Sequence, residues 1–139
     1  MTYTTDDKDF NKIDQVCDIF QFDTQKAIES LGGVPDIVWA SPPCTYFSVA
    51  SIGHHWNQDH TPKTKEAMLG VSVIKKTLDI ITYLKSQNND LVYIIENPRG
   101  KLRKLDLIDS RLLHTVTYCQ YGDSRMKPTD IWTNLAWTP

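Results

Sequence analysis

The sequence predicts an α/β fold with a mainly parallel sheet, because strand-like and helix-like patterns alternate along the chain. Residues 36–40 form an apolar, β-rich run that stops at Pro42 and Pro43 and predicts a buried strand. Residues 65–86 carry apolar side chains at three- and four-residue spacing, which predicts a long amphipathic helix. Residues 91–95 form a second apolar run. Two strands separated by one helix are typical of parallel neighbours in a sheet.

Shorter elements are expected on either side of this unit. Residues 24–31 predict a short helix that ends at Gly32 and Gly33, and residues 45–62 show no clear period and predict a long loop. Four further segments have strand-like patterns: 3–5, 15–20, 115–119 and 131–134. No repeat or linker divides the chain, so residues 1–139 are expected to form a single domain.

Composition and charge limit the kinds of function. The chain is 40% hydrophobic and 23% charged, and its net charge of −2 provides no global attraction for nucleic acid. No apolar run approaches the ~20 residues that span a bilayer. The N-terminus has no signal-peptide pattern, so we expect a cytoplasmic protein without a membrane partner. One local cluster is basic: Arg99, Lys101, Arg103 and Lys104. These residues form either a solvated charged surface or a set of contacts to phosphate groups.

The three cysteines, Cys17, Cys44 and Cys119, lie far apart and form no CxxC pair, so no structural zinc site is expected. Cys17 and Cys119 occupy apolar, strand-like settings and are expected to be buried. Cys44 follows two prolines, which fix φ and restrict the residues before them. A stiff loop of this kind holds a thiol in one place, as a nucleophile requires.

A second chemical group is expected beside Cys44. Glu96 directly follows the strand at 91–95, and the carboxyl ends of neighbouring parallel strands meet at one sheet edge. A thiol and a carboxyl at one edge leave several chemistries open. A cysteine protease would need a histidine base, and a metal site would need Cys44 together with two histidines. The available histidines in the nearby loop are His54, His55 and His60, without a known signature around them.

These residues carry a family resemblance. Ser41-Pro42-Pro43-Cys44, followed by Phe47-Ser48, resembles the nucleophile motif of the DNA cytosine-5 methyltransferases. Glu96-Asn97-Pro98 is similar to the second catalytic motif of that family, Glu-Asn-Val. Residues 118–134 resemble segments of phage-type members, and Cys17-Asp18-Ile19 resembles the segment near the cofactor adenine. Three separated motifs in the family's order make the resemblance specific.

The resemblance implies a Rossmann-like methyltransferase fold that depends on S-adenosylmethionine and releases S-adenosylhomocysteine. The thiolate of Cys44 would add to C6 of a flipped-out cytosine in DNA, Glu96 would act at N3, and Arg125 would hold the base or the thiolate region. The remaining expected roles fall into two groups. Cofactor contacts are implied for Asp6, Asp7, Asp18, Ser41 and Pro42, and substrate contacts for Pro43, Ser48, Asn97, Arg99, Lys101 and Arg103.

The chain also departs from the family pattern. It has no Phe-x-Gly-x-Gly loop to cradle the methionine end of the cofactor, and no target-recognition region follows the last motif. We therefore expect a truncated or split member, from a bacterial or phage-infected cell. An exposed sheet edge would invite a homodimer or a complementing chain. The competing interpretation is an inactive, methyltransferase-like binding or interaction module. RNA remains open as an alternative substrate to DNA.

Overall fold

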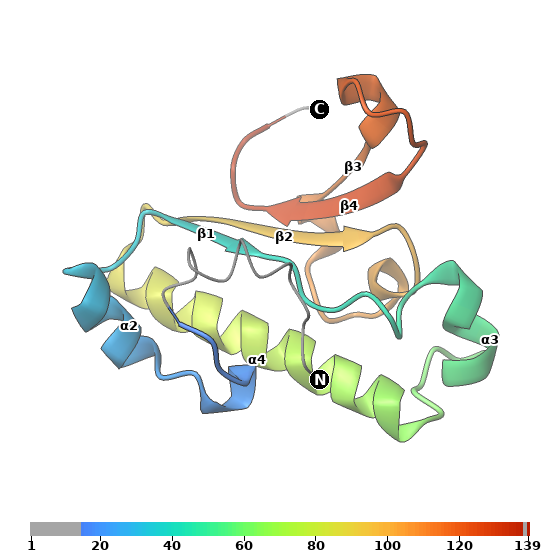
Figure 1. The fold of residues 1–139 in the computed structure, drawn as a ribbon, viewed down its shortest axis with the longest axis horizontal. Coiled ribbons are helices and arrows are strands. Elements are labelled where there is room, and N and C mark those ends of the chain that lie inside the picture. Colours follow the sequence, from blue (N-terminus) through green and yellow to red (C-terminus); the bar gives the residue numbers. More distant parts are fainter. Residues whose placement is uncertain (1–14, 138) are drawn as a thin grey trace.

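The computed structural model describes residues 15–137 and residue 139 (Figure 1). Helices and strands alternate, as the sequence pattern predicts. The bounds, in chain order, are η1 (Ile19–Gln21), α2 (Thr24–Leu31), β1 (Ile37–Ala40), η2 (Val49–Ser51), α3 (Ile52–His55), α4 (Lys65–Gln87), β2 (Val92–Pro98), η3 (Leu102–Lys104), η4 (Ser110–Leu112), β3 (Leu113–Thr117), η5 (Tyr118–Tyr121) and β4 (Pro128–Thr133).

The described strands form one four-stranded sheet in the order β1-β2-β4-β3. Strands β1 and β2 are parallel, as expected for two strands joined through α4. The pairs β2–β4 and β3–β4 are antiparallel, so the sheet is mixed rather than mainly parallel. The reason lies in the connection between β3 and β4, which runs only from residue 118 to 127. A parallel crossover needs about a dozen residues or more, so this shorter connection returns the chain antiparallel.

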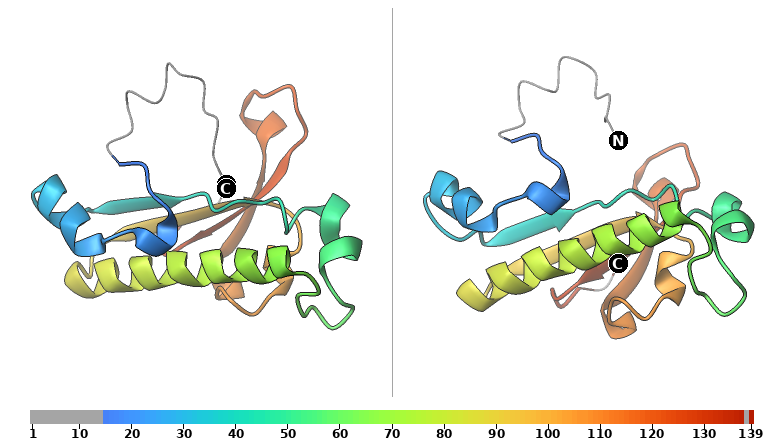
Figure 2. Two further views of the ribbon diagram at one scale, coloured as in Figure 1. Left: turned by 60° about the horizontal axis from the view of Figure 1, so that its bottom comes forward. Right: turned by 90° about the horizontal axis from the view of Figure 1, so that it is seen from below.

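Helix α4 lies along one face of the sheet, beneath β1 and β2 (Figures 1 and 2). The helix begins where the Thr64 side chain accepts a hydrogen bond from the backbone of Ala67, an N-cap that satisfies one free amide. Its buried stripe includes Ala67, Ile74 and Ile81, which belong to the same apolar cluster as Trp132 of β4. This packing holds the end of β2 against the helix layer and fixes the sheet edge at which the candidate site lies.

The opposite face of β1 carries exposed side chains. Ile37 and Trp39 have 65% and 61% of their surfaces exposed, whereas Val38 and Ala40 pack against the core on the α4 side. The prediction of a buried strand at 36–40 is therefore half right. Among the described residues, β1 is an edge strand with β2 as its partner.

Several element boundaries differ from the predictions. Residues 15–20 form no strand, because the Asp18 side chain accepts from the Phe20 amide and starts the short helix η1. The strand expected at 115–119 ends at Thr117, and η5 follows it. As a result Cys17 and Cys119 are exposed, not buried. The loop expected at 45–62 contains the short helices η2 and α3.

Other predicted elements are confirmed. Helix α2 ends at Gly32, whose φ of 74° favours glycine, and α4 extends one residue beyond the predicted helix. The strand expected at 3–5 lies outside the described residues, as do Asp6 and Asp7. In the part of the chain that the structure describes, no helix is both long and apolar enough to cross a membrane.

Candidate active site

Cys44 and Glu96 line the same cavity, as the strand–helix–strand arrangement predicts. Ala40 is paired with Ile95, so the loop after β1 emerges beside Glu96. The cavity has a volume of about 280 Å³. Its lining residues come from the loop after β1, the end of β2 and the start of β4: Ser41, Pro42, Pro43, Cys44, Thr45, Glu96, Pro98 and Lys127.

The loop that carries Cys44 is held by hydrogen bonds on both sides of the thiol. The side chain of Asn97, which is fully buried, donates from Nδ2 to the carbonyl oxygen of Pro42 at 2.9 Å. The backbone amide of Phe47 donates to the carbonyl oxygen of Cys44, also at 2.9 Å. The family resemblance implies two roles for Asn97, a substrate contact and a hydrogen bond that orients this loop, and its buried bond to Pro42 is of the second kind. The thiol itself is partly exposed and free.

Glu96 lies within β2, not in a loop after it, because pairing with β4 continues the strand to Pro98. Its backbone is therefore held by the sheet through its pairing with Ile131 of β4. Its Oε1 atom is buried and has no hydrogen-bond partner among the described residues. Buried polar atoms almost always have a hydrogen-bond partner. An unpaired carboxylate oxygen on a residue that lines a cavity is therefore available to bond to a ligand in that cavity.

The cation that lines the cavity is Lys127, which the sequence reasoning missed. Its Nζ atom also lies 4.9 Å from the ring centroid of Tyr118. The expected cation was Arg125, but its side chain is 72% exposed and pairs with Asp123 at 2.7 Å. This pairing holds the pKa of Asp123 down to about 2. The signal for Lys127 was its position two residues after Arg125, in the same segment.

The basic cluster at 99–104 divides into residues with different surroundings. Arg99 and Lys104 are exposed, consistent with phosphate contacts. Lys101 is only 4% exposed, because its side chain lies against Trp56 and reaches His60. Arg103 donates to Thr115 and to the buried carboxylate of Asp130, both at 2.7 Å. These internal contacts differ from the phosphate contacts expected of Lys101 and Arg103.

The residues expected to bind S-adenosylmethionine do not form a complete site among the described residues. The Asp18 carboxylate caps η1, and the Ser41 hydroxyl accepts from Nε1 of Trp39 at 2.8 Å. Ser41 and Pro42 line the cavity that contains Cys44. The first glycine of the sequence is Gly32, so residues 1–31 contain no glycine-rich loop. The described residues therefore do not fit the cofactor by themselves.

Ser48 and the loop histidines lie outside the Cys44 cavity. Ser48 Oγ lies 3.1 Å from Ser51 Oγ, at the start of η2. His55 Nδ1 bonds to Thr64, and His60 Nδ1 to Lys101. No histidine is placed as a base for Cys44, so the protease interpretation has no support in the described part of the chain. Nor do the described residues contain a group of three or more potential metal ligands.

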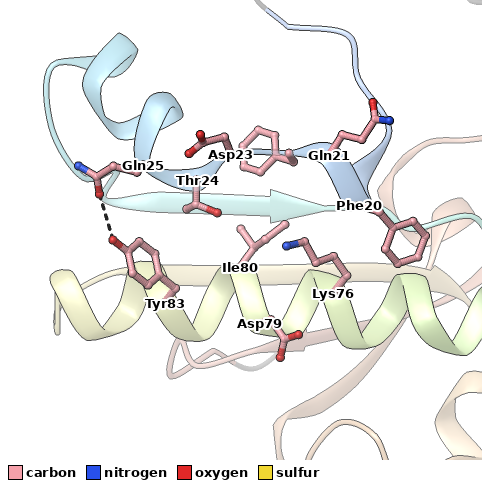
Figure 3. A pocket seen from close by; sticks show the side chains of 10 residues that line it. Phe20, Gln21, Asp23, Thr24, Gln25, Lys76, Asp79, Ile80 and Tyr83 are labelled. Atoms are coloured by element: carbon pink, nitrogen blue, oxygen red, sulfur yellow. Dashed lines mark hydrogen bonds between the residues drawn. The ribbon is translucent and has the colours of Figure 1, made fainter.

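A larger cavity of about 520 Å³ lies between η1, the start of α2 and the middle of α4 (Figure 3). Its lining is mixed in character, with Phe20 and Ile80 beside Lys76 and Asp79 (Figure 3). The hydroxyl of Tyr83 donates to Gln25 across one end of it. Of the expected catalytic and binding residues that the structure describes, none lines this cavity. Size alone therefore does not mark the chemical site here.

A comparison with curated proteins supports the resemblance read from the motifs. The chain is 32% identical over 105 residues to a "Probable DNA (cytosine-5)-methyltransferase" of Frog virus 3 (isolate Goorha). The match supports the DNA (cytosine-5)-methyltransferase family. It covers 72% of this chain but 46% of the relative, so the chain spans less than half of that protein. No family model and no solved structure matches the chain.

Proposed function

We propose that this chain is the catalytic part of a DNA cytosine-5 methyltransferase. The observation that carries the proposal is that Cys44 and Glu96, 52 positions apart in sequence, line one cavity together with Lys127. The curated relative is named for the same activity. We further propose that residues 1–139 act as one partial domain of the Rossmann-like, phage-type methyltransferase architecture.

The proposed reaction begins at C6 of a cytosine. The thiolate of Cys44 forms a bond to C6, and the electron pair of the C5–C6 double bond moves into the ring, which makes C5 carbanion-like. Glu96 provides a proton or a hydrogen bond at N3, where negative charge would otherwise collect. A bound S-adenosylmethionine would supply the methyl group to C5 and would leave as S-adenosylhomocysteine. Loss of the original C5 proton to water then re-forms the C5–C6 double bond and expels the thiolate of Cys44.

The site residues fit the separate demands of this step. The unpaired Oε1 of Glu96 is free to meet N3 of a base that enters the cavity. Lys127 lines the same cavity, and its positive charge would stabilise the negative charge that develops on the ring. Pro43 restricts the backbone just before Cys44, and Asn97 holds the same loop through its hydrogen bond to Pro42. The target base must leave the DNA stack to reach Cys44, which costs a few kcal/mol.

DNA is the proposed macromolecular substrate, with Arg99 and Arg125 as exposed cations for the phosphates. Family membership implies S-adenosylmethionine as the methyl donor. Because the described residues do not complete a site for it, we propose that a second copy or a complementing chain at the β1 edge takes part in binding the donor. The competing interpretation is a module that retains the fold and binds partners without catalysis.

Calorimetry and a methylation assay separate these interpretations. We expect the chain to bind S-adenosylhomocysteine, alone or with a complementing chain, and to transfer a labelled methyl group to DNA. Cys44→Ala should bind the same ligand but transfer no methyl group. Cys119→Ala is the matched control, because that thiol is exposed and lies outside the cavity. Binding without transfer by the wild type would favour the interaction module. An RNA oligonucleotide of the same sequence tests the alternative substrate.

A further inference from the structure

We propose that Met126 is an apolar wedge that inserts into a DNA duplex beside the Cys44 cavity and fills the gap left by the base that enters the cavity. The proposal rests on the proposed function in that DNA is the substrate, and it assigns a role to a segment outside the catalytic residues. This segment is the connection between β3 and β4, residues 118–127. The connection projects from the sheet on the side opposite α4 (Figures 1 and 2).

Met126 is highly exposed and lies next to the cavity. Its exposed fraction of 78% is the largest among the large apolar side chains that the structure describes. A single exposed apolar side chain is common on protein surfaces, so exposure alone assigns no role. The next residue, however, is Lys127, which lines the cavity together with Cys44 and Glu96. Because consecutive Cα atoms are about 3.8 Å apart, Met126 lies at the rim of the cavity.

The backbone bends at Met126. The amide of Lys127 donates to the carbonyl oxygen of Arg125 at 3.1 Å, which closes a three-residue γ-turn with Met126 at its centre. A bend of this kind places the central side chain on its outer side, in agreement with the exposure of Met126. The amide of Tyr118, at the start of the connection, donates to the carbonyl oxygen of Lys127 at 3.3 Å. The turn is therefore anchored to the other end of the connection.

The residues before the bend are held by a local ion pair. The amide of Arg125 donates to Oδ1 of Asp123 at 2.8 Å, and the guanidinium lies 2.7 Å from Oδ2. Because these contacts fix the connection before DNA binds, little conformational order has to be created at the interface. Met126 is thus held between two cations, Arg125 and Lys127. Proteins that insert an apolar side chain between base steps combine it with basic residues in the same way.

The movement of a base into the cavity gives this side chain a defined place to bind. Removing a base from the stack is unfavourable, and it leaves a gap between the two neighbouring base pairs. An apolar side chain that enters the gap leaves water and covers the faces of those base pairs, so it offsets part of this cost. Methionine suits such a gap because its side chain is unbranched and flexible. The flanking cations would contact phosphates on either side, which favours DNA over an apolar protein partner.

The test compares the affinity of the full chain for two labelled DNA duplexes by fluorescence anisotropy. One duplex is fully paired, and the other has the same sequence with a single abasic site, so that a gap is already present. We expect the wild type to bind the abasic duplex about tenfold more tightly, the order of effect expected for burial of one methionine side chain. Met126→Ala should bind both duplexes with similar affinity, and Met126→Leu should keep the preference. Met68→Ala is the matched control, because Met68 is also exposed but lies on α4.

Three results would overturn the wedge: a wild type without preference for the abasic duplex, a preference that persists in Met126→Ala, or a preference lost in Met126→Leu as well. Melting curves identify any variant that fails to fold. The assay needs no methyl donor and no reaction, so each of these results leaves the proposed function intact. Absence of binding to both duplexes would instead contradict DNA as the substrate and overturn both proposals. Arg125→Met should weaken binding to the two duplexes equally, because it removes a phosphate contact and leaves the wedge in place.

Discussion

Lys127 lines the cavity that contains Cys44, whereas the side chain of Arg125 is exposed and pairs with Asp123. Two cations separated by one residue thus have different surroundings and should have different effects. A charge on the cavity wall acts on the reacting ring, and an exposed one acts on the DNA backbone. The two side chains differ in their partners, because Arg125 pairs with Asp123 and Lys127 lies over the ring of Tyr118.

Replacement of each cation by methionine tests this division of roles. We expect Lys127→Met to lower the single-turnover rate about 10²-fold, the usual effect of removing one preorganised charge-stabilising group. Arg125→Met should leave that rate nearly unchanged and lower the slope of DNA affinity against salt by about 0.9. Equal rate losses in both variants would contradict a special role of Lys127 in the reaction.

At the scale of elements, the end of β2 and the turn after it are supported by a buried ion pair. Arg103 and Asp130 lie 2.7 Å apart, and the Asp130 side chain is 1% exposed. Thr115 of β3 donates to the same carboxylate oxygen, so the pair joins η3 to both β3 and β4. Because Asn97 is paired with Asp130 in the sheet register, this group lies directly behind the residue that holds the nucleophile loop.

Breaking this pair from one side should be costly. Asp130→Asn is expected to lower the free energy of unfolding by roughly 3 kcal/mol, because it leaves a partly buried guanidinium without a counter-charge. Chemical denaturation measures the change. Arg111→Met is the matched control, since its pair with Asp109 is exposed and should contribute little. A stability loss in the control as large as in Asp130→Asn would contradict the structural role of the buried pair.

The elements also show what sequence patterns can predict. The helix at 65–87 and the meeting of Cys44 with Glu96 were predictable, because they depend on local periodicity and on strand order. The extension of β2 to Pro98 was not, since it depends on pairing with β4, which is distant in sequence. From the sequence, Lys101 was expected to be a charged surface residue. Its burial could not be predicted, because it depends on contacts with Trp56 and His60 from another segment.

At the scale of the whole molecule, strand β1 carries exposed apolar side chains. Ile37 and Trp39 are exposed side by side on an edge strand, and no charged or proline residue within the strand blocks pairing. Helix α2, which precedes this strand, has no buried residue. These features together favour association through β1, which is one of the two edge strands of the described sheet.

Light scattering over a wide concentration range tests this association. We expect the apparent mass of the wild type to rise with concentration, and Trp39→Lys to reduce the rise. Val49→Lys is the control, because Val49 is 71% exposed but lies outside β1. A wild-type chain that stays monomeric throughout, with no change in Trp39→Lys, would contradict self-association through this strand.

The central claim is that Cys44 adds to C6 of cytosine. Addition makes C5 carbanion-like, so the C5 hydrogen should exchange with water even before any methyl donor is supplied. The direct measurement is release of tritium from DNA that carries tritium at C5 of cytosine. The account predicts release by the wild type, little release by Glu96→Gln, and none by Cys44→Ala. Release that persists in Cys44→Ala, or DNA binding by the wild type without any release, would contradict it.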